Sequence, residues 1–271
     1  MSDLLSAANN PKHGIQEMVL NPKLLYPNLE ERRQFEARFS EFLMVDDCLK
    51  TIQYEKGIIT YKTESVIPSM TDARPPLLLL FGNPAPESVN NGCFFAGEKN
   101  RPEHRFWMAV RDAGVISFET LHDSRDRTQA LFDLRYSSPF RIGLAVLYSM
   151  PSPASNPKWS GVQGLRRLFG AQALAEITRY ERQRILELVK VFIPTGSSGR
   201  VIAFQKDAYN EIKDESRGSE TVARNGRWSV SKAKCTGLEI GLYKMPPTRY
   251  MNAHWYADLL QAATQIGVKH E

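Results

Sequence analysis

The stretch Pro75–Trp107 reads PPLLLLFGNPAPESVNNGCFFAGEKNRPEHRFW, and it decides the fold class. It opens with the apolar run Leu77–Phe81, which is short enough for a buried strand and too short to span a membrane. The run stops at residues 82–86 (GNPAP), where two prolines and a glycine prevent a strand or a helix from continuing. Open α/β sheets bind ligands at the carboxyl ends of their strands, and Asn83 stands at such an end.

Later apolar runs repeat this arrangement. They lie at Arg141–Met150, Arg200–Phe204 and Leu238–Lys244, with helical patterns between them. Strands that alternate with helices predict a parallel sheet covered by helices on both faces. We therefore predict the α/β class over residues 61–271: a three-layer α/β/α domain around a central, mostly parallel sheet of about four strands. Residues 1–60 are expected to form a helical extension, because a stripe of three phenylalanines predicts a helix near residues 29–43.

The composition restricts the possible functions. The 271 residues carry a net charge of +5, which favours an anionic partner without identifying one. The cysteines Cys48, Cys93 and Cys235 form no CxxC pair, which argues against a zinc finger and a four-cysteine iron–sulfur cluster. Their odd, sparse number is typical of a reducing compartment. No apolar run reaches the ~18 residues of a membrane span. We therefore expect an intracellular, cytoplasmic protein without a membrane partner.

The order and spacing of these motifs resemble the uracil-DNA glycosylase superfamily, most closely its mismatch-specific uracil/thymine-DNA glycosylase branch. In that branch a strand ends in Gly-Ile-Asn-Pro-Gly, and a loop ending in Phe-Ala and a segment of Asn-Arg-Phe-Trp type follow. The matching residues here are Asn83-Pro84, Phe95-Ala96 and Arg105–Trp107. The chain departs from the pattern in having Phe81-Gly82 for Gly-Ile and Ala85 for the final Gly.

Two later segments extend the resemblance. Ile142–Leu144 lies where the family has Gly-Leu-Thr, followed by a loop that approaches DNA and here contains Ser152. The last predicted strand ends in MPPTRYMN over residues 245–252. Its Met-Pro is similar to the Met-Pro-Ser-Ser of the thymine-processing enzymes, which precedes a wedge residue, whereas Pro247 and Thr248 depart from that motif.

The resemblance implies a role for each matching residue. Asn83 is the catalytic residue, which holds a water by its carbonyl oxygen, since an amide can orient water but is not a strong base. Phe95 stacks on the flipped base. The implied base pocket is Gly82, Pro84, Ala85, Phe95 and Met245. The implied DNA contacts are Ser152, Thr248, Arg249 and Tyr250, with Arg249 or Tyr250 as the wedge.

The implied activity is hydrolysis of the N-glycosidic bond of uracil flipped out of DNA, a step of base excision repair. Mismatched thymine and damaged pyrimidines are further candidate substrates. The chemistry requires no metal and no cofactor. We expect a monomer that acts on a uracil-containing or mismatched duplex, and whether it also acts on single-stranded DNA stays open.

Other interpretations stay open. Asn-Pro commonly opens a turn, a Phe pair is commonly core, and HRFW can simply start a helix. The altered positions 82, 85 and 247 would permit a DNA-binding relative with weak or lost catalysis. A small-molecule α/β enzyme is a third possibility, although the chain contains no G-x-G-x-x-G, no G-x-x-x-x-G-K-[ST] and no G-x-S-x-G sequence.

Overall fold

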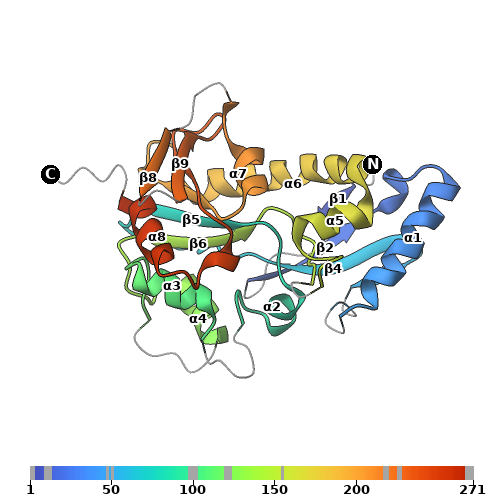
Figure 1. Cartoon of the computed structure of the whole chain (residues 1–271), viewed down its shortest axis with the longest axis horizontal. Coiled ribbons are helices and arrows are strands. Elements are labelled where there is room, and N and C mark those ends of the chain that lie inside the picture. Colours follow the sequence, from blue (N-terminus) through green and yellow to red (C-terminus); the bar gives the residue numbers. More distant parts are fainter. Residues whose placement is uncertain are drawn as a thin grey trace. The chain divides into compact units, whose positions relative to one another are not determined.

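The computed structural model describes a chain of mixed α/β class, which confirms the predicted class (Figure 1). The described residues are 4–8, 14–46, 49, 52–96, 103–118, 124–153, 156–215, 220–224 and 228–265. The chain divides into two compact units, each assembled from separate stretches. The first unit is Met1–Ser65, Gly82–Phe94 and Val146–Ile185, and the second is Val66–Phe81, Phe95–Ala145 and Leu186–Glu271. The units are thus interleaved along the sequence and do not divide at residue 60, where we placed a domain boundary.

The first unit contains a four-stranded antiparallel sheet in the order β1-β2-β4-β3. Its strands are β1 (Leu5–Ala7), β2 (Ile15–Leu20), β3 (Gln53–Glu55) and β4 (Ile58–Glu64). In β4 the buried residues Ile59, Tyr61 and Thr63 alternate with more exposed ones, as expected for a strand with one covered face. The expected helical extension therefore contains a sheet as well as a helix. The short, mixed β1 and β2 segments show little apolar period in isolation, and they are held by pairing, β2 with β4 and β1 with β2.

Helix α1 (Leu29–Leu43) forms as predicted in this unit. The Asn28 side-chain oxygen accepts a hydrogen bond from the Glu30 N–H at 2.8 Å, which caps the first turn. The phenylalanine stripe at residues 35, 39 and 42 is buried, and the Phe42 ring meets Trp159 edge-on at 5.8 Å. The other helical elements of this unit are η1 (Pro22–Leu24), α2 (Pro86–Asn91), α5 (Gly161–Phe169) and the first part of α6 (Ala171–Phe192).

The second unit contains nearly all of a six-stranded mixed sheet in the order β6-β5-β7-β10-β9-β8. Its strands are β5 (Pro76–Phe81), β6 (Arg141–Val146), β7 (Arg200–Ala203), β8 (Glu220–Arg224), β9 (Trp228–Lys234) and β10 (Gly241–Lys244). Both β5 and β10 pair with β7 in parallel, whereas β9 and β8 continue the sheet in antiparallel pairs. The sheet is therefore larger than the four strands we expected. The antiparallel pair β8 and β9 lies within residues 214–236, a segment rich in polar residues.

The three parallel strands β5, β7 and β10 end within one residue of one another. Leu80 of β5 and Lys244 of β10 both lie opposite Ala203, the last residue of β7. All six residues of β5 are buried, as the apolar run predicted. The helical elements of this unit are α3 (Arg105–Asp112), α4 (Ser124–Phe132), α7 (Lys206–Ile212), η4 (Thr248–Tyr250), α8 (Trp255–Gln265) and the end of α6. Across the described ranges, no helix combines the length and apolar character that a membrane crossing requires.

Candidate functional site

Asn83 follows the last residue of β5 by two positions, and its side-chain amide is held in one orientation. The amide nitrogen Nδ2 donates to Ser152 Oγ at 2.8 Å and to the Pro84 carbonyl oxygen at 3.3 Å. These two bonds occupy the NH₂ group and leave the amide oxygen Oδ1 as the available acceptor. Within the described part of the chain, no protein hydrogen bond reaches Oδ1, and Asn83 is partly exposed. The amide is therefore oriented to accept a hydrogen bond from a water or a ligand.

The loop that follows β6 supplies the group that holds Asn83. The Tyr148 N–H donates to the Gly82 carbonyl oxygen at 2.8 Å, and the Ser152 N–H donates to the Pro84 carbonyl oxygen at 3.2 Å. These backbone bonds fix the loop on both sides of Asn83. Ser152 is only 2% exposed, so its hydroxyl is placed to orient the Asn83 amide. The DNA contact that we predicted for Ser152 stays a prediction.

A buried carboxylate anchors the start of the same loop. Glu181 Oε1 accepts the Ser149 N–H at 2.6 Å and the Ser149 hydroxyl at 2.5 Å. The Ser149 hydroxyl oxygen also lies 2.8 Å from the Tyr61 hydroxyl. Because the Ser149 hydroxyl donates its hydrogen to Glu181, the Tyr61 hydroxyl is the donor to Ser149 Oγ. Burial raises the pKa of Tyr61, which keeps this hydroxyl protonated. The side chain of Glu181 is 1% exposed, and its partners are therefore all within the protein.

Arg184 neutralises this carboxylate and ties it to the end of β6. Its Nε donates to Glu181 Oε2 at 2.7 Å, and its Nη2 donates to the carbonyl oxygens of residues 146 and 147 at 2.7 and 2.9 Å. Both side chains belong to α6. The Glu-x-x-Arg spacing is the sequence feature that pairs the two side chains on one helix face, but it does not reveal their burial.

The amino end of α5 lies beside Asn83. A Cβ atom placed on Gly161 would lie 4.0 Å from Asn83 Oδ1, so the first residue of α5 lies close to this oxygen. Gly161 has φ +60°, a conformation that glycine adopts without strain. The first N–H groups of a helix carry partial positive charge and lack partners within the helix. A water bound at Oδ1 would therefore lie near backbone donors.

The second unit holds Phe95, the predicted base-stacking residue. Its ring is stacked on Phe106 at 4.2 Å and on His104 at 5.0 Å between centroids, and it meets Phe81 edge-on at 5.0 Å. Phe95 has φ 52°, which is uncommon for a residue with a large side chain. His104 caps α3, since its Nδ1 accepts the Phe106 N–H at 3.1 Å. Phe95 is partly exposed, but two neighbouring rings already stack on it.

The segment after β10 carries the remaining predicted residues. Met245 is buried, and its N–H donates to the Ala203 carbonyl oxygen at 2.8 Å. Thr248 and Tyr250 are partly buried, whereas Arg249 is exposed. The Arg249 guanidinium carbon lies 5.0 Å from the centre of the Tyr250 ring. Of the two predicted wedge residues, Arg249 is therefore the more exposed.

The predicted residues fall into two groups, one in each unit. The first unit contains Gly82, Asn83, Pro84, Ala85 and Ser152, and the second contains Phe95, Met245, Thr248, Arg249 and Tyr250. In the first group Gly82 and Pro84 are buried and Ala85 is the N-cap residue of α2. The structure brings the first group together around the Asn83 amide.

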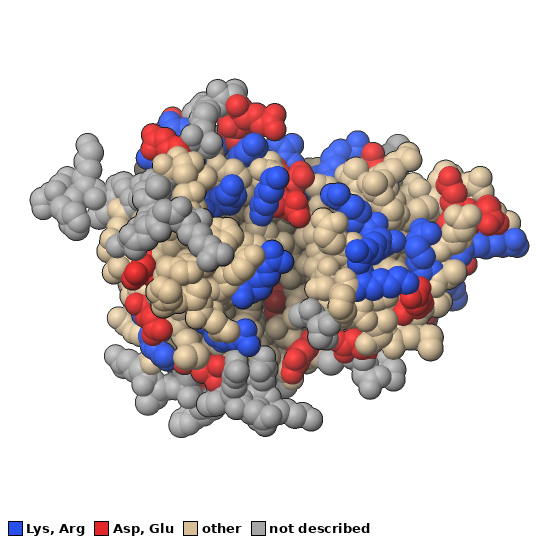
Figure 2. All heavy atoms as spheres, viewed as in Figure 1, with Lys and Arg blue, Asp and Glu red and all other residues tan. Residues whose placement is uncertain are grey.

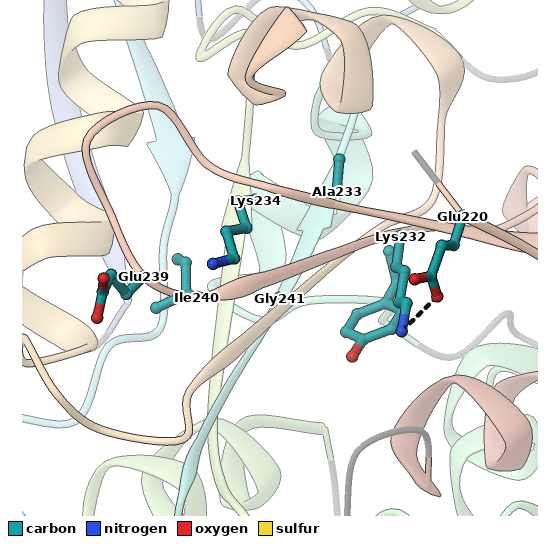
Figure 3. Close-up of a pocket in the computed structure, with 8 residues that line it drawn as sticks. Glu220, Lys232, Ala233, Lys234, Glu239, Ile240 and Gly241 are labelled. Carbon is teal, nitrogen blue, oxygen red and sulfur yellow. Dashed lines mark ion pairs between the residues drawn. The ribbon is translucent and has the colours of Figure 1, made fainter. Parts of the chain in front are cut away.

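A cavity of about 470 Å³ lies in the second unit on strands β8, β9 and β10 (Figure 3). Its walls carry charges of both signs, among them an ion pair of 2.6 Å between Lys232 and Glu220 that raises the pKa of the lysine. It contains none of the predicted residues, and we assign it no role in the chemistry. Among the described residues, no group of three or more His, Cys, Asp or Glu side chains could hold a metal ion.

No protein-family model matches the chain, and no curated protein is significantly similar to it. The family resemblance therefore rests on the motifs themselves.

Proposed function

We propose that the protein is a monofunctional uracil-DNA glycosylase, with mismatched thymine or a damaged pyrimidine as a further substrate. The observation that carries the proposal is the Asn83 amide, which Ser152 Oγ and the Pro84 carbonyl oxygen orient so that Oδ1 can accept a hydrogen bond. This is the group that the resemblance requires at the end of a buried strand. The same proposal includes the three-layer glycosylase fold and a monomer that acts on DNA inside the cell.

The reaction needs a positioned water and little else from the protein. As the bond between the sugar carbon and the base nitrogen breaks, its electrons leave with uracil as an anion and the sugar gains oxocarbenium character. A water held by Asn83 Oδ1 adds to the sugar carbon and releases its proton to solvent, because an amide does not accept it. Asn83 therefore acts by positioning, and its fixed orientation is what such a role requires.

Stacking on Phe95 belongs to the same proposal. The ring is partly exposed, and base–aromatic stacking is favourable for any base. Because His104 and Phe106 already stack on this ring, we propose that a flipped base takes the place of the His104 imidazole. The Phe106 ring is buried and stays where it supports Phe95.

Exposed basic side chains of the first unit support the proposal that the partner is an anion such as DNA. Figure 2 shows lysine and arginine side chains gathered over α1 and α5 of the first unit, where Arg33, Arg166 and Arg167 are exposed. The two arginines of α5 lie in its last turn, whereas the helix begins beside Asn83 Oδ1, so they would contact phosphates at a distance from the glycosidic bond that is cut. Contacts of this kind bind phosphates without reading sequence.

The proposal is tested with a 5′-labelled duplex that contains one uracil. The protein is incubated in excess with the duplex, the product is treated with alkali, and the strands are separated on a denaturing gel. We expect a break at the uracil, because alkali cleaves the abasic site that excision leaves. An intact strand at high protein excess would reject the proposal. Parallel reactions with single-stranded uracil DNA and with a thymine–guanine mismatch define the substrate range.

A second candidate is a DNA-binding protein of the same fold with little or no catalysis. The observation that favours it is the Phe95 ring, on which His104 and Phe106 stack in place of a base. This candidate predicts affinity for a duplex with an abasic site and no turnover in the gel assay.

A further inference from the structure

Three aromatic rings form a surface cluster in the second unit. They come from three different elements: Trp228 begins β9, Tyr250 lies in η4, and Trp255 begins α8. The two indole rings are stacked at 5.5 Å with an interplanar angle of 24°. The Tyr250 ring lies 5.1 Å from Trp228 and 6.5 Å from Trp255. We call these three residues the aromatic platform.

All three rings of the aromatic platform are partly exposed. The other two of the four tryptophans, Trp107 and Trp159, are 3% and 1% exposed and belong to the core. Aromatic side chains contribute most to stability when they are fully buried, and rings that stay at the surface in a group mark a contact surface. The two tryptophans of the platform therefore differ in kind from the two core tryptophans.

A positive charge borders the aromatic platform. The exposed Arg249 guanidinium lies over the Tyr250 ring at 5.0 Å, and its Nη2 is 3.3 Å from the Tyr250 hydroxyl oxygen. Flat rings with an adjacent arginine are the arrangement that binds single-stranded nucleic acids, because bases stack on the rings while a cation pairs with the phosphates. An apolar peptide would use the rings but would not use the guanidinium beside them.

We propose that the aromatic platform binds unpaired nucleotides of a single-stranded nucleic acid, with the bases stacked on Trp228 and Trp255 and a phosphate paired with Arg249. This surface includes neither Asn83 nor Phe95. The inference shares Arg249 and Tyr250 with the DNA contacts predicted above and so deepens the nucleic-acid binding of the proposed function, but a binding measurement decides it rather than turnover.

The test uses intrinsic tryptophan fluorescence of the full chain. The protein is titrated with an oligothymidylate and with an oligomer of the same number of phosphates built from abasic nucleotides. We expect the oligothymidylate to quench the fluorescence and to bind at least tenfold more tightly, since only it offers bases to stack. Oligouridylate in place of oligothymidylate shows whether DNA or RNA is preferred. Equal affinity for the thymidylate and abasic oligomers, or no binding of either, would overturn the proposal.

Matched variants locate the stacking surface. Trp228→Ala and Trp255→Ala should each reduce the preference for bases over abasic nucleotides by at least threefold, whereas Trp159→Phe in the core should leave it unchanged. Trp255→Phe keeps a ring and should retain most of the preference. Thermal melts identify any variant that fails to fold, and the comparison of the two oligomers on the unaltered protein decides the proposal in that case. A full preference in both alanine variants would assign the bases to another surface.

Discussion

Replacing Ser152 with alanine removes the acceptor that holds the Asn83 amide at 2.8 Å. One hydrogen bond of this kind contributes about 0.5–1.5 kcal/mol to stability. The amide keeps only its longer bond of 3.3 Å to the Pro84 carbonyl oxygen, so Oδ1 loses its fixed direction. If the loss of this bond raises the activation free energy by its full energy, ~1.4 kcal/mol corresponds to a tenfold slower reaction. We therefore expect Ser152→Ala to slow uracil excision about tenfold at saturating protein.

The assay is single-turnover excision from a uracil-containing duplex, with urea unfolding of each variant as a companion measurement. Ser149→Ala is the matched control, because this serine is also buried in the loop after β6 but bonds to Glu181 and Tyr61. We expect the control to lose at least as much stability as Ser152→Ala while its excision rate changes less than about threefold. A wild-type rate for Ser152→Ala, or equal slowing in both variants, would refute the role of Ser152 as the residue that orients Asn83.

Three further predictions concern buried charge and DNA contact. Glu181→Gln leaves Arg184 without its anion, so we expect urea unfolding to show a loss of about 3–5 kcal/mol; a change below about 1 kcal/mol would contradict the anchoring role. Burial raises the pKa of the Glu64 carboxyl well above 4.5. As the pH rises above the pKa that Glu64 has in the unfolded chain, the unfolded state releases this proton while the folded state keeps it, so the folded state loses stability relative to the unfolded state. The stability of Glu64→Gln relative to wild type, measured by urea unfolding at acidic, neutral and alkaline pH, should therefore increase with pH, and a constant difference would show that Glu64 is ionised in the fold. Arg249→Ala should reduce the slope of log affinity against log salt by about 0.7–0.9 if this arginine contacts one phosphate; an unchanged slope would remove it from the DNA contacts.

The features that the sequence predicted correctly are those that depend on neighbouring residues. The apolar run before residue 82 is a buried strand, and the phenylalanine stripe after Asn28 is the buried face of α1. Each of these is encoded within about ten residues by apolar spacing or by turn residues.

The features that the sequence did not reveal depend on contacts between distant segments. Strands β8 and β9 carry many polar residues and are stabilised by pairing: β8 pairs with β9, and β9 pairs with β10. The burial of Ser152 follows from its contacts with residues 83 and 84, which lie far away in the sequence. The burial of Glu181 likewise depends on Ser149, which precedes it by 32 residues. A single sequence contains no signal for such pairings.

The central claim is that the Asn83 amide positions the water that cuts the glycosidic bond, and Asn83→Ala tests it most directly. The measurement is single-turnover excision of uracil from a labelled duplex, together with binding of the same variant to a duplex that contains an abasic site. We predict that excision is abolished while abasic-site binding stays within about threefold of wild type, because the alanine removes Oδ1 without altering phosphate contacts. An Asn83→Ala variant that excises uracil at the wild-type rate would contradict the claim.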